Sequence, residues 1–266
     1  MIGPADIHAL ILDMDGVLWR GSTLLDGVRE LFDELSRSHR AAVVATNNAT
    51  VDPASVVARL AQAGVTFPAN LVLTSADAAG GYLARTFTAP IRVHVVGEAP
   101  LRRSLEQAAC QIVPAVDHPQ AVVVGMDRHL DWGKLTDATL AIRAGAAFIG
   151  TNPDRTFPSE RGIGPGNGAV LAALEAATGV SPTVVGKPEP HLFLEAALRL
   201  QVQPPGCLVV GDRLETDILG GQRAGMRTAL LLTGVTSKGQ LPTSTIQPEL
   251  VFDDLLALAT WLKASG

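Results

Sequence analysis

Short apolar runs alternate with segments of helical periodicity along nearly the whole chain, and this alternation constrains the fold most strongly. The runs are rich in Val, Ile and Leu, and each ends at Gly, Asp, Asn or Thr. Such runs are typical of strands buried on both faces, and their alternation with helices implies right-handed crossovers to a parallel sheet. The expected fold class is therefore α/β. Strands are expected at 9–12, 41–45, 91–96, 121–124, 184–185, 208–210 and 228–232, with helices at 28–35, 54–63, 101–109, 135–144, 169–177, 192–200 and 215–224.

Composition and charge exclude several classes of partner. The 266 residues are 47% hydrophobic and 18% charged, as in ordinary globular proteins. Lys and Arg total 21 against 26 Asp and Glu, and sequence-independent nucleic-acid binding needs clustered positive charge. The sequence shows neither a bilayer-spanning apolar stretch nor a signal peptide, and its two cysteines cannot make a disulfide framework. We therefore expect no nucleic-acid partner, no membrane partner and a cytoplasmic location.

Polar residues directly follow four of the apolar runs. In open parallel sheets, ligands bind beyond the carboxyl ends of the strands, so these residues are the candidates for a site. They combine carboxylates, a hydroxyl, amides and a lysine, which favours one coherent site. The four segments are Asp13-Met14-Asp15-Gly16, Thr46-Asn47-Asn48, Gly186-Lys187-Pro188 and Gly211-Asp212 with the following Asp217.

Asp13 and Asp15 flank a single residue at the end of the first run. Two carboxylates this close repel each other unless a proton or a cation intervenes. The pair suits a nucleophile and a general acid–base group. Taken alone, the same residues are equally consistent with a capping pair at an Asp-Gly turn.

Asp212 and Asp217 stand five positions apart, at a strand end and in the first turn of the next expected helix. Hard oxygen ligands of this kind suit Mg²⁺. Lys187 lies at a strand end inside a loop, where it is well placed for a phosphate, and Thr46 and Asn47 offer a hydroxyl and amides. The alternatives are helix capping for the carboxylates and the Thr-Asn-Asn segment, and a solvated surface position for the lysine.

Together, these segments resemble the four ordered motifs of the haloacid dehalogenase superfamily. More narrowly, they resemble its class IIA branch, which contains NagD-like enzymes and 4-nitrophenylphosphatases. The similarity covers nearly all of the chain, because it continues through the middle. It includes Gly125-Met126-Asp127-Arg128, Gly150-Thr151-Asn152-Pro153-Asp154 and Pro165-Gly166-Asn167-Gly168-Ala169.

The resemblance implies a Mg²⁺-dependent phosphatase that hydrolyses small-metabolite phosphate monoesters through an aspartyl-phosphate intermediate. Asp13 would attack phosphorus, and Asp15 would act first as acid and then as base. The Asp13 carboxylate, the Asp15 backbone carbonyl and Asp212 would hold Mg²⁺, while Asp217 would bind it through water or orient Lys187. The implied substrates are 4-nitrophenyl phosphate, nucleoside monophosphates, phosphoglycolate or sugar phosphates. The phosphoryl group would be bound by Thr46, Asn47, Asn48 and Lys187.

About 140 residues lie between Thr46 and Lys187, too many for one crossover, and they show βα alternation of their own. The resemblance implies that they contain an inserted α/β cap domain of the C2 type over a Rossmann-like parallel sheet core flanked by helices. We expect the core at 1–79 and 183–266 and the cap at 80–182, with hinges near Gly80-Gly81 and 178–182. A homodimer formed through the cap is the candidate assembly. Asp154, Arg155 and Arg161 are candidate substrate contacts of the cap, although a plain surface position is an equally good interpretation of each.

Two further segments carry expectations about local structure. The glycine run at 162–168 misses the spacing of a dinucleotide-binding loop, and we expect a loop that leads into the following helix. Residues 233–248 are expected to form a loop, and residues 251–262 an amphipathic helix.

Two other functions stay open on the sequence. One is a catalytically weak phosphate-ester-binding or regulatory protein on the same fold, which would be expected to have lost Asp13, Asp15 or Lys187. All three are present. The other is a different hydrolase of the haloacid dehalogenase type, although Asp15 argues against halide chemistry.

Overall fold

The structure is a computed structural model that describes residues 2–159 and 162–264, and it divides into two compact units. Unit 1 comprises Met1–Thr46, Asp52–Leu73 and Pro188–Gly266, and unit 2 comprises Asn47–Val51 and Thr74–Lys187. The chain therefore passes between the units four times.

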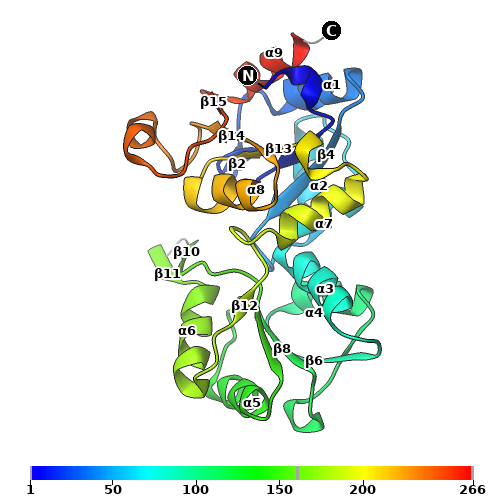
Figure 1. Cartoon of the computed structure of the whole chain (residues 1–266), viewed down its shortest axis with the longest axis vertical. Helices are drawn as coiled ribbons and strands as arrows, with labels where there is room; N and C mark the ends of the chain where they lie inside the picture. Colours follow the sequence, from blue (N-terminus) through cyan, green and yellow to red (C-terminus); the bar gives the residue numbers. More distant parts are fainter. Residues whose placement is uncertain (1, 160–161, 265–266) are drawn as a thin grey trace. The chain divides into compact units, whose positions relative to one another are not determined.

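A six-stranded sheet with the order β15-β14-β13-β1-β4-β5 forms the centre of unit 1 (Figure 1). β1 (Ala9–Leu12) is fully buried and pairs in parallel with β13 (Cys207–Gly211) and β4 (Ala41–Thr46). The chain leaves β1 toward β4 and later returns on the other side to β13. The boundary between β1 and β13 is therefore the topological switch point, where α/β sheets bind ligands. The outer strands are β14 (Arg227–Leu231), β15 (Leu250–Phe252) and β5 (Val72–Thr74).

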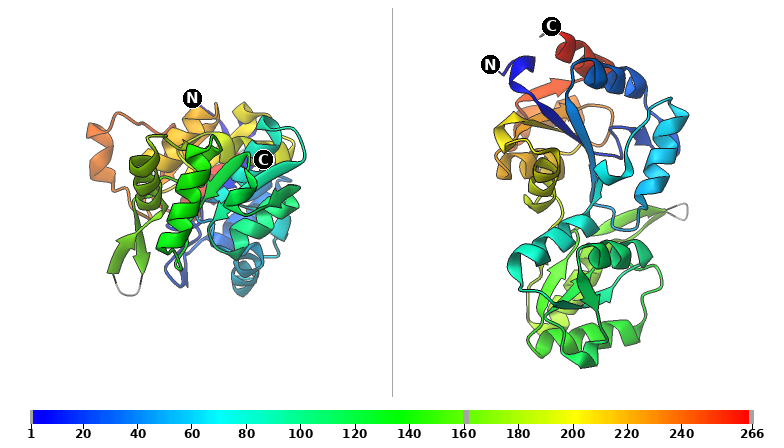
Figure 2. Two further views of the ribbon diagram at one scale, coloured as in Figure 1. Left: turned by 90° about the horizontal axis from the view of Figure 1, so that it is seen from below. Right: turned by 90° about the vertical axis from the view of Figure 1, so that its right-hand side faces the viewer.

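Helices lie on both faces of this sheet, with α1 and α2 in blue and cyan on one side in the right-hand view of Figure 2. α7 packs on β1 and β4, α8 packs on β14, and α1 packs on α9 and β4. Among the described residues, no helix is both long and apolar enough to cross a bilayer. The helices are α1 (Val28–Arg37), α2 (Pro53–Gln62), α7 (His191–Leu200), α8 (Leu219–Arg223) and α9 (Leu255–Lys263), and 3₁₀ turns lie at Pro4–Asp6, Ala69–Leu71, Pro204–Gly206 and Lys238–Thr243.

Unit 2 contains a five-stranded sheet with the order β12-β9-β8-β6-β7, parallel throughout, and a two-stranded hairpin of β10 and β11. α5 and α6 pack on each other and on the sheet around a core that includes Val122, Phe148 and Leu171. The strands are β6 (Ile91–Val96), β7 (Cys110–Ile112), β8 (Ala121–Val124), β9 (Ala147–Gly150), β10 (Thr156–Ser159), β11 (Gly162–Pro165) and β12 (Thr183–Val184). The helices are α3 (Ser75–Thr86), α4 (Ala99–Gln107), α5 (Trp132–Arg143) and α6 (Asn167–Thr178), with a 3₁₀ turn at Ala115–Asp117.

The predicted α/β class and parallel sheets are confirmed, but two local predictions are wrong. The first part of the glycine run is strand β11, because it pairs with β10, and only Gly166 onward leads into α6. The last helix begins at Leu255 rather than 251, because Asp254 caps it and residues Leu250–Phe252 instead pair with β14. The expected loop at 233–248 contains the 3₁₀ turn Lys238–Thr243.

The residues expected to hinge at Gly80-Gly81 lie inside α3. Gly80 is buried, and a Cβ there would stand 2.7 Å from the Ala108 Cβ just after α4. Gly80 is thus enclosed by helix packing. The chain passes between the two units after Leu73 and after Lys187, and also after Thr46 and Val51, while the expected bounds of core and cap stay a prediction.

Candidate functional site

Three carboxylates meet at the switch point of the sheet in unit 1. One carboxylate oxygen from each of Asp13, Asp212 and Asp217 lies within 4.8 Å of the other two. Asp13 directly follows β1 and Asp212 directly follows β13, while Asp217 lies in a turn of π-helix at Leu214–Ile218. Asp212 and Asp217 are each 1% exposed and Asp13 is half-buried. The structure thus brings together three of the four residues predicted as metal ligands through their side chains or backbone.

Backbone N–H groups orient the two buried carboxylates. Val235 N donates to Asp212 Oδ2 at 2.7 Å, and Arg213 N donates to Asp217 Oδ2 at 3.1 Å. Hydrogen bonds of this kind to a charged acceptor are stronger than neutral ones. They fix the carboxylates before any ligand arrives.

Gly16 lets the loop after β1 pass close to Asp212. Its φ is +86°, a region that L side chains avoid, and a Cβ there would stand 2.5 Å from Asp212 Oδ2. Both the backbone conformation and the space therefore require glycine. The Asp-Gly turn and the carboxylate site are features of the same segment rather than alternatives.

The donor set of this cluster fits a hard divalent cation. Two ionised carboxylates whose oxygens lie within 4.8 Å of each other repel by at least about 3 kcal/mol at an effective dielectric constant of about 20. A cation between them turns this repulsion into attraction, and Mg²⁺ prefers carboxylate oxygens and retained waters. Three converging carboxylates, two of them almost fully buried, are the kind of site this ion takes.

Asp15 lies on the exposed side of the same loop and takes a different partner. Its Oδ1 accepts a hydrogen bond from Trp19 Nε1 at 3.0 Å. Trp19 begins the hairpin of β2 (Trp19–Arg20) and β3 (Thr23–Leu24). The loop is closed by Gly16 N, which donates to Trp19 O at 2.7 Å. The Asp15 side chain therefore has a partner of its own and is not one of the three carboxylates of the cluster.

Thr46 is the last residue of β4, the strand next to β1, and is 4% exposed. Parallel neighbouring strands end at the same edge of a sheet. Thr46 therefore lies at the sheet edge that carries Asp13, as the strand-end argument predicted.

Asn47 and Lys187 are joined within unit 2. Lys187 N donates to Asn47 Oδ1 at 2.7 Å, and Asn47 Nδ2 donates to Lys187 O at 3.0 Å. The Asn47 carbonyl accepts from Ser75 Oγ at 2.6 Å and from Asn152 Nδ2 at 2.8 Å. Lys187 is only 2% exposed. The Asn47 side-chain amide thus holds the backbone of Lys187, and the role of Asn47 in substrate binding stays a prediction.

Asn48 uses its side chain locally. Its Oδ1 accepts from Thr50 N at 3.0 Å and from Thr50 Oγ1 at 2.7 Å. These bonds shape the short segment that returns the chain to unit 1.

Asp154 and Arg155 lie in the loop between β9 and β10. Their backbone carbonyls accept from Gly168 N at 2.8 Å and from Gly166 N at 2.9 Å, which ties the loop to the start of α6. The Arg155 side chain is exposed and that of Asp154 is half-buried. Arg161, the third candidate of this region, lies outside the described residues.

Sequence reasoning missed the contributions of Trp19, Ser75 and Val235. The strand-end argument could have found Val235, because Thr233-Gly234-Val235 follows the apolar run that forms β14. Trp19 carried no comparable signal, since its contact depends on how tightly the loop after Asp15 folds back.

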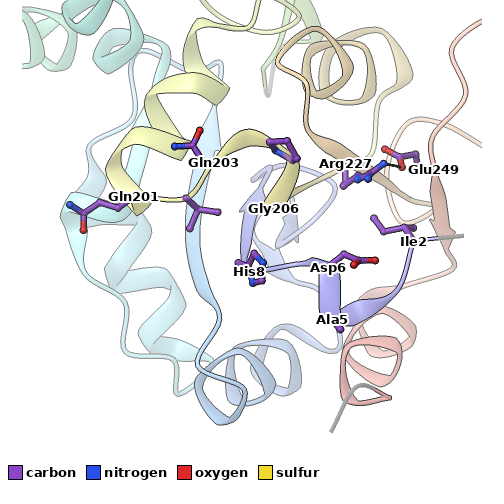
Figure 3. Close-up of a pocket in the computed structure, with 11 residues that line it drawn as sticks. Ile2, Ala5, Asp6, His8, Gln201, Gln203, Gly206, Arg227 and Glu249 are labelled. Atoms are coloured by element: carbon purple, nitrogen blue, oxygen red, sulfur yellow. Dashed lines mark hydrogen bonds and ion pairs between the residues drawn. The ribbon is translucent and has the colours of Figure 1, made fainter.

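A broad cavity of about 1040 Å³ lies at the other end of the same sheet (Figure 3). His8 precedes β1 and Gly206 precedes β13, whereas Asp13 and Asp212 follow these strands. Arg227 and Glu249 both line this cavity and form an ion pair at 2.9 Å. Among the described residues that line it, there is none of the predicted site residues.

Two family models together match most of the three stretches of unit 1 and a part of unit 2. One, described as "Haloacid dehalogenase-like hydrolase", matches residues 10–111. The other, described as HAD-hydrolase-like, matches residues 184–258. The matches include all four strand ends.

The chain is similar to several phosphatases over nearly its full length. It is 34% identical over 248 residues to an acid sugar phosphatase of Staphylococcus epidermidis, covering 93% of this chain and 95% of that protein. A p-nitrophenyl phosphatase structure from Archaeoglobus fulgidus is 31% identical with a TM-score of 0.89, covering 96% and 99% of the two chains. A glycerol phosphate phosphatase from Mycobacterium tuberculosis in complex with magnesium is 37% identical with a TM-score of 0.88, covering 97% and 78%.

Proposed function

The chain belongs to the haloacid dehalogenase-like hydrolases and is a phosphatase of that family, and from this premise we propose that it is a Mg²⁺-dependent phosphomonoesterase of small metabolites. The observation that carries the proposal is the convergence of Asp13, Asp212 and Asp217 within 4.8 Å. The magnesium complex of the glycerol phosphate phosphatase, a similar chain, supports the choice of metal.

For the substrate we propose a sugar or polyol phosphate. Similar chains carry the names acid sugar phosphatase and glycerol phosphate phosphatase, which support this class. We expect 4-nitrophenyl phosphate to serve as an artificial substrate, because similar chains are named after it. Nucleoside monophosphates and phosphoglycolate belong in the same panel.

We propose that Asp13 and Asp15 share the covalent chemistry. An Asp13 carboxylate oxygen attacks phosphorus, and the ester bond to the leaving oxygen breaks while Asp15 donates its proton to that oxygen. Water then attacks the aspartyl-phosphate, Asp15 takes the proton of the water, and inorganic phosphate leaves with Asp13 restored. Mg²⁺ held by Asp13, the Asp15 carbonyl, Asp212 and Asp217 would neutralise charge between the carboxylates and the phosphoryl oxygens.

Lys187, Thr46 and the backbone N–H groups of Asn47 and Asn48 are proposed to bind the phosphoryl oxygens. Asn47 has a second task in this scheme, since its side-chain amide fixes the backbone of Lys187. Phosphoryl transfer depends mainly on positioning and charge stabilisation, and this set supplies both.

We further propose that unit 1 is the catalytic core and unit 2 the cap that selects the leaving group. Asp154 and Arg155 are the proposed selectors. Their backbones are tied to the start of α6, so their side chains are presented from a fixed loop. Alanine substitution of either is expected to change the order of preferred substrates.

The decisive experiment compares Mg²⁺-dependent phosphate release by the wild-type protein and Asp13→Asn across this panel. Asp33→Asn is the matched control, because Asp33 is a 73% exposed side chain on α1 paired only with Arg29 in the described structure. We expect Asp13→Asn to abolish turnover and Asp33→Asn to retain it. Full activity in Asp13→Asn would overturn the nucleophile assignment, while binding of phosphate esters without turnover by the wild type would favour the regulatory alternative.

A homodimer through unit 2 stays a prediction. α5 exposes Trp132 (81%) and Leu140 (61%), and we propose that Trp132 takes part in the contact. A solution mass of twice 27.7 kDa that falls to 27.7 kDa in Trp132→Lys would support it, and a monomeric wild type would contradict it.

A further inference from the structure

We propose that Trp19 is a positioning residue for Asp15. The indole N–H of Trp19 holds Oδ1 of Asp15, and this leaves Oδ2 of Asp15 to transfer the proton. The inference rests on the proposed function, because it takes Asp15 to be the acid–base group. The inference adds Trp19, which is not among the charged and polar residues that follow the four strands. It also distinguishes between the two carboxyl oxygens of Asp15.

The contact itself is a single directed hydrogen bond. Trp19 Nε1 donates to Asp15 Oδ1 at 3.0 Å, and Trp19 is 2% exposed. Among the described residues, Oδ2 of Asp15 accepts no hydrogen bond. An indole N–H can only donate, so it neither gives up its proton nor accepts one during turnover.

This donor separates the roles of the two carboxyl oxygens. A proton on Oδ1 would turn it into a hydroxyl oxygen, a weaker acceptor for the indole N–H, whereas a proton on Oδ2 leaves Oδ1 as a carbonyl oxygen and the hydrogen bond intact. Oδ1 therefore stays an acceptor in both protonation states, and Oδ2 carries the proton that moves to the leaving oxygen and later comes from water.

The backbone and the indole ring of Trp19 are each held in place. Trp19 N donates to Met14 O at 3.3 Å and Trp19 O accepts from Gly16 N at 2.7 Å, which fixes the backbone within the loop that carries Asp15. The Arg59 guanidinium of α2 lies 4.1 Å from the centroid of the ring, in cation–π contact.

Arg59 also connects the hairpin to α2. Its Nη2 donates to Gly21 O between β2 and β3. Burial lowers the pKa of Arg59, and attraction to Asp15 opposes that shift, so the two charges act on each other. A ring held in this way can hold a carboxylate in one rotamer.

The functional consequence depends on the leaving group. A strongly basic oxygen needs a proton as the ester bond breaks, whereas 4-nitrophenolate is a weak base and leaves without one. Loss of the Trp19 contact should therefore slow the first chemical step for basic leaving groups and spare 4-nitrophenyl phosphate. A merely structural defect would slow both.

The test measures kcat/KM with Mg²⁺ for phenyl phosphate and 4-nitrophenyl phosphate, which differ mainly in the basicity of the leaving oxygen. The variants are Trp19→Phe and a protein in which benzothienylalanine replaces Trp19, keeping the ring shape without the N–H. Trp261→Phe is the control, because Trp261 of α9 packs on Phe252 of β15 and is not part of the Asp15 loop. We expect roughly a tenfold loss with phenyl phosphate, since positioned acid catalysis is worth 10²–10⁴-fold and only its orientation is lost. With 4-nitrophenyl phosphate we expect less than about a threefold loss.

Equal losses for the two substrates, or no loss in the benzothienylalanine protein, would overturn the inference while leaving the phosphatase proposal intact. In an Asp15→Asn background, Trp19→Phe should leave the ratio of the two kcat/KM values unchanged, and a further change would also overturn it. Failure of the proposed function would instead appear as a wild-type protein that hydrolyses neither ester.

Discussion

Replacing Asn47 by alanine removes both hydrogen bonds that its side chain makes to the backbone of Lys187. A neutral hydrogen bond contributes about 1 kcal/mol net, so the pair is worth about 2 kcal/mol. The loss is not made up by water, because Lys187 is 2% exposed and its N–H would be left buried. We therefore expect the free energy of local opening at Lys187 to fall by about 2 kcal/mol or more.

Hydrogen exchange of the Lys187 amide measures this opening directly. A change of about 2 kcal/mol corresponds to roughly 30-fold faster exchange. Asn47→Asp keeps the size and the acceptor but sets a carboxylate oxygen against Lys187 O, so we expect at least as large an effect. Asn48→Ala is the matched control, since the Asn48 amide bonds to Thr50 in the same short segment.

An exchange rate of Lys187 in Asn47→Ala within twofold of the wild type would refute the reasoning. A similar acceleration in Asn48→Ala would show that the whole segment, rather than the Asn47 amide, protects Lys187. If Lys187 binds the phosphoryl group as proposed, Asn47→Ala should also raise KM more than Asn48→Ala does.

Three further outcomes follow from the geometry. Gly16→Ala should lower the free energy of unfolding by about 2 kcal/mol or more in urea titration, because φ is +86° and the new Cβ would meet Asp212; a loss under about 0.5 kcal/mol would contradict this. Mg²⁺ should raise the Tm of the wild type and do so much less for Asp212→Asn, and an equal rise would remove Asp212 from the ligand set. Burial raises the pKa of the Cys207 thiol from 9.0 to about 11, so its contribution to stability is complete below pH 9 and is lost as pH rises toward 11. Cys207→Ala should lose less stability over that pH interval than the wild type, and parallel curves would contradict the assignment.

The sheets were predictable because burial on both faces leaves an unmistakable apolar run. Residues 9–12 and 121–124 form β1 and β8 with the expected bounds, and their side chains are fully buried. The ends of the strands follow from the same runs, so the sequence predicts one site for Asp13 and Asp212, whose carboxylate oxygens lie within 4.8 Å of each other.

Helix α3 escaped prediction because its apolar residues are mostly Ala and Gly, which give little periodicity. The sequence does carry the capping box of Thr74 and Asp77, in which Asp77 Oδ2 accepts from Thr74 N at 2.8 Å and Thr74 Oγ1 accepts from Asp77 N at 3.4 Å. The sequence predicts helix from residue 251, within strand β15, because three apolar residues do not fix a period and only pairing with β14 decides their conformation.

The part of the site that could not be predicted consists of contacts between residues far apart in sequence. Asn47 and Lys187 are separated by 140 positions, and neither motif indicates that the Asn47 side-chain amide hydrogen-bonds to the backbone of Lys187. Trp19 shows the same limit over a shorter distance, since its hydrogen bond depends on a loop geometry that the sequence pattern does not specify.

Because the chain passes between the units four times, unit 2 is not one continuous segment that could be exchanged between related proteins. Recombining only residues 74–187 into a related core would leave the segment Asn47–Val51 behind. Lys187 would then arrive without the amide that holds its backbone, and Ser75 and Asn152 would arrive without their carbonyl acceptor. Exchange of specificity between relatives therefore calls for two grafts, the long insertion and the five-residue segment from the same donor.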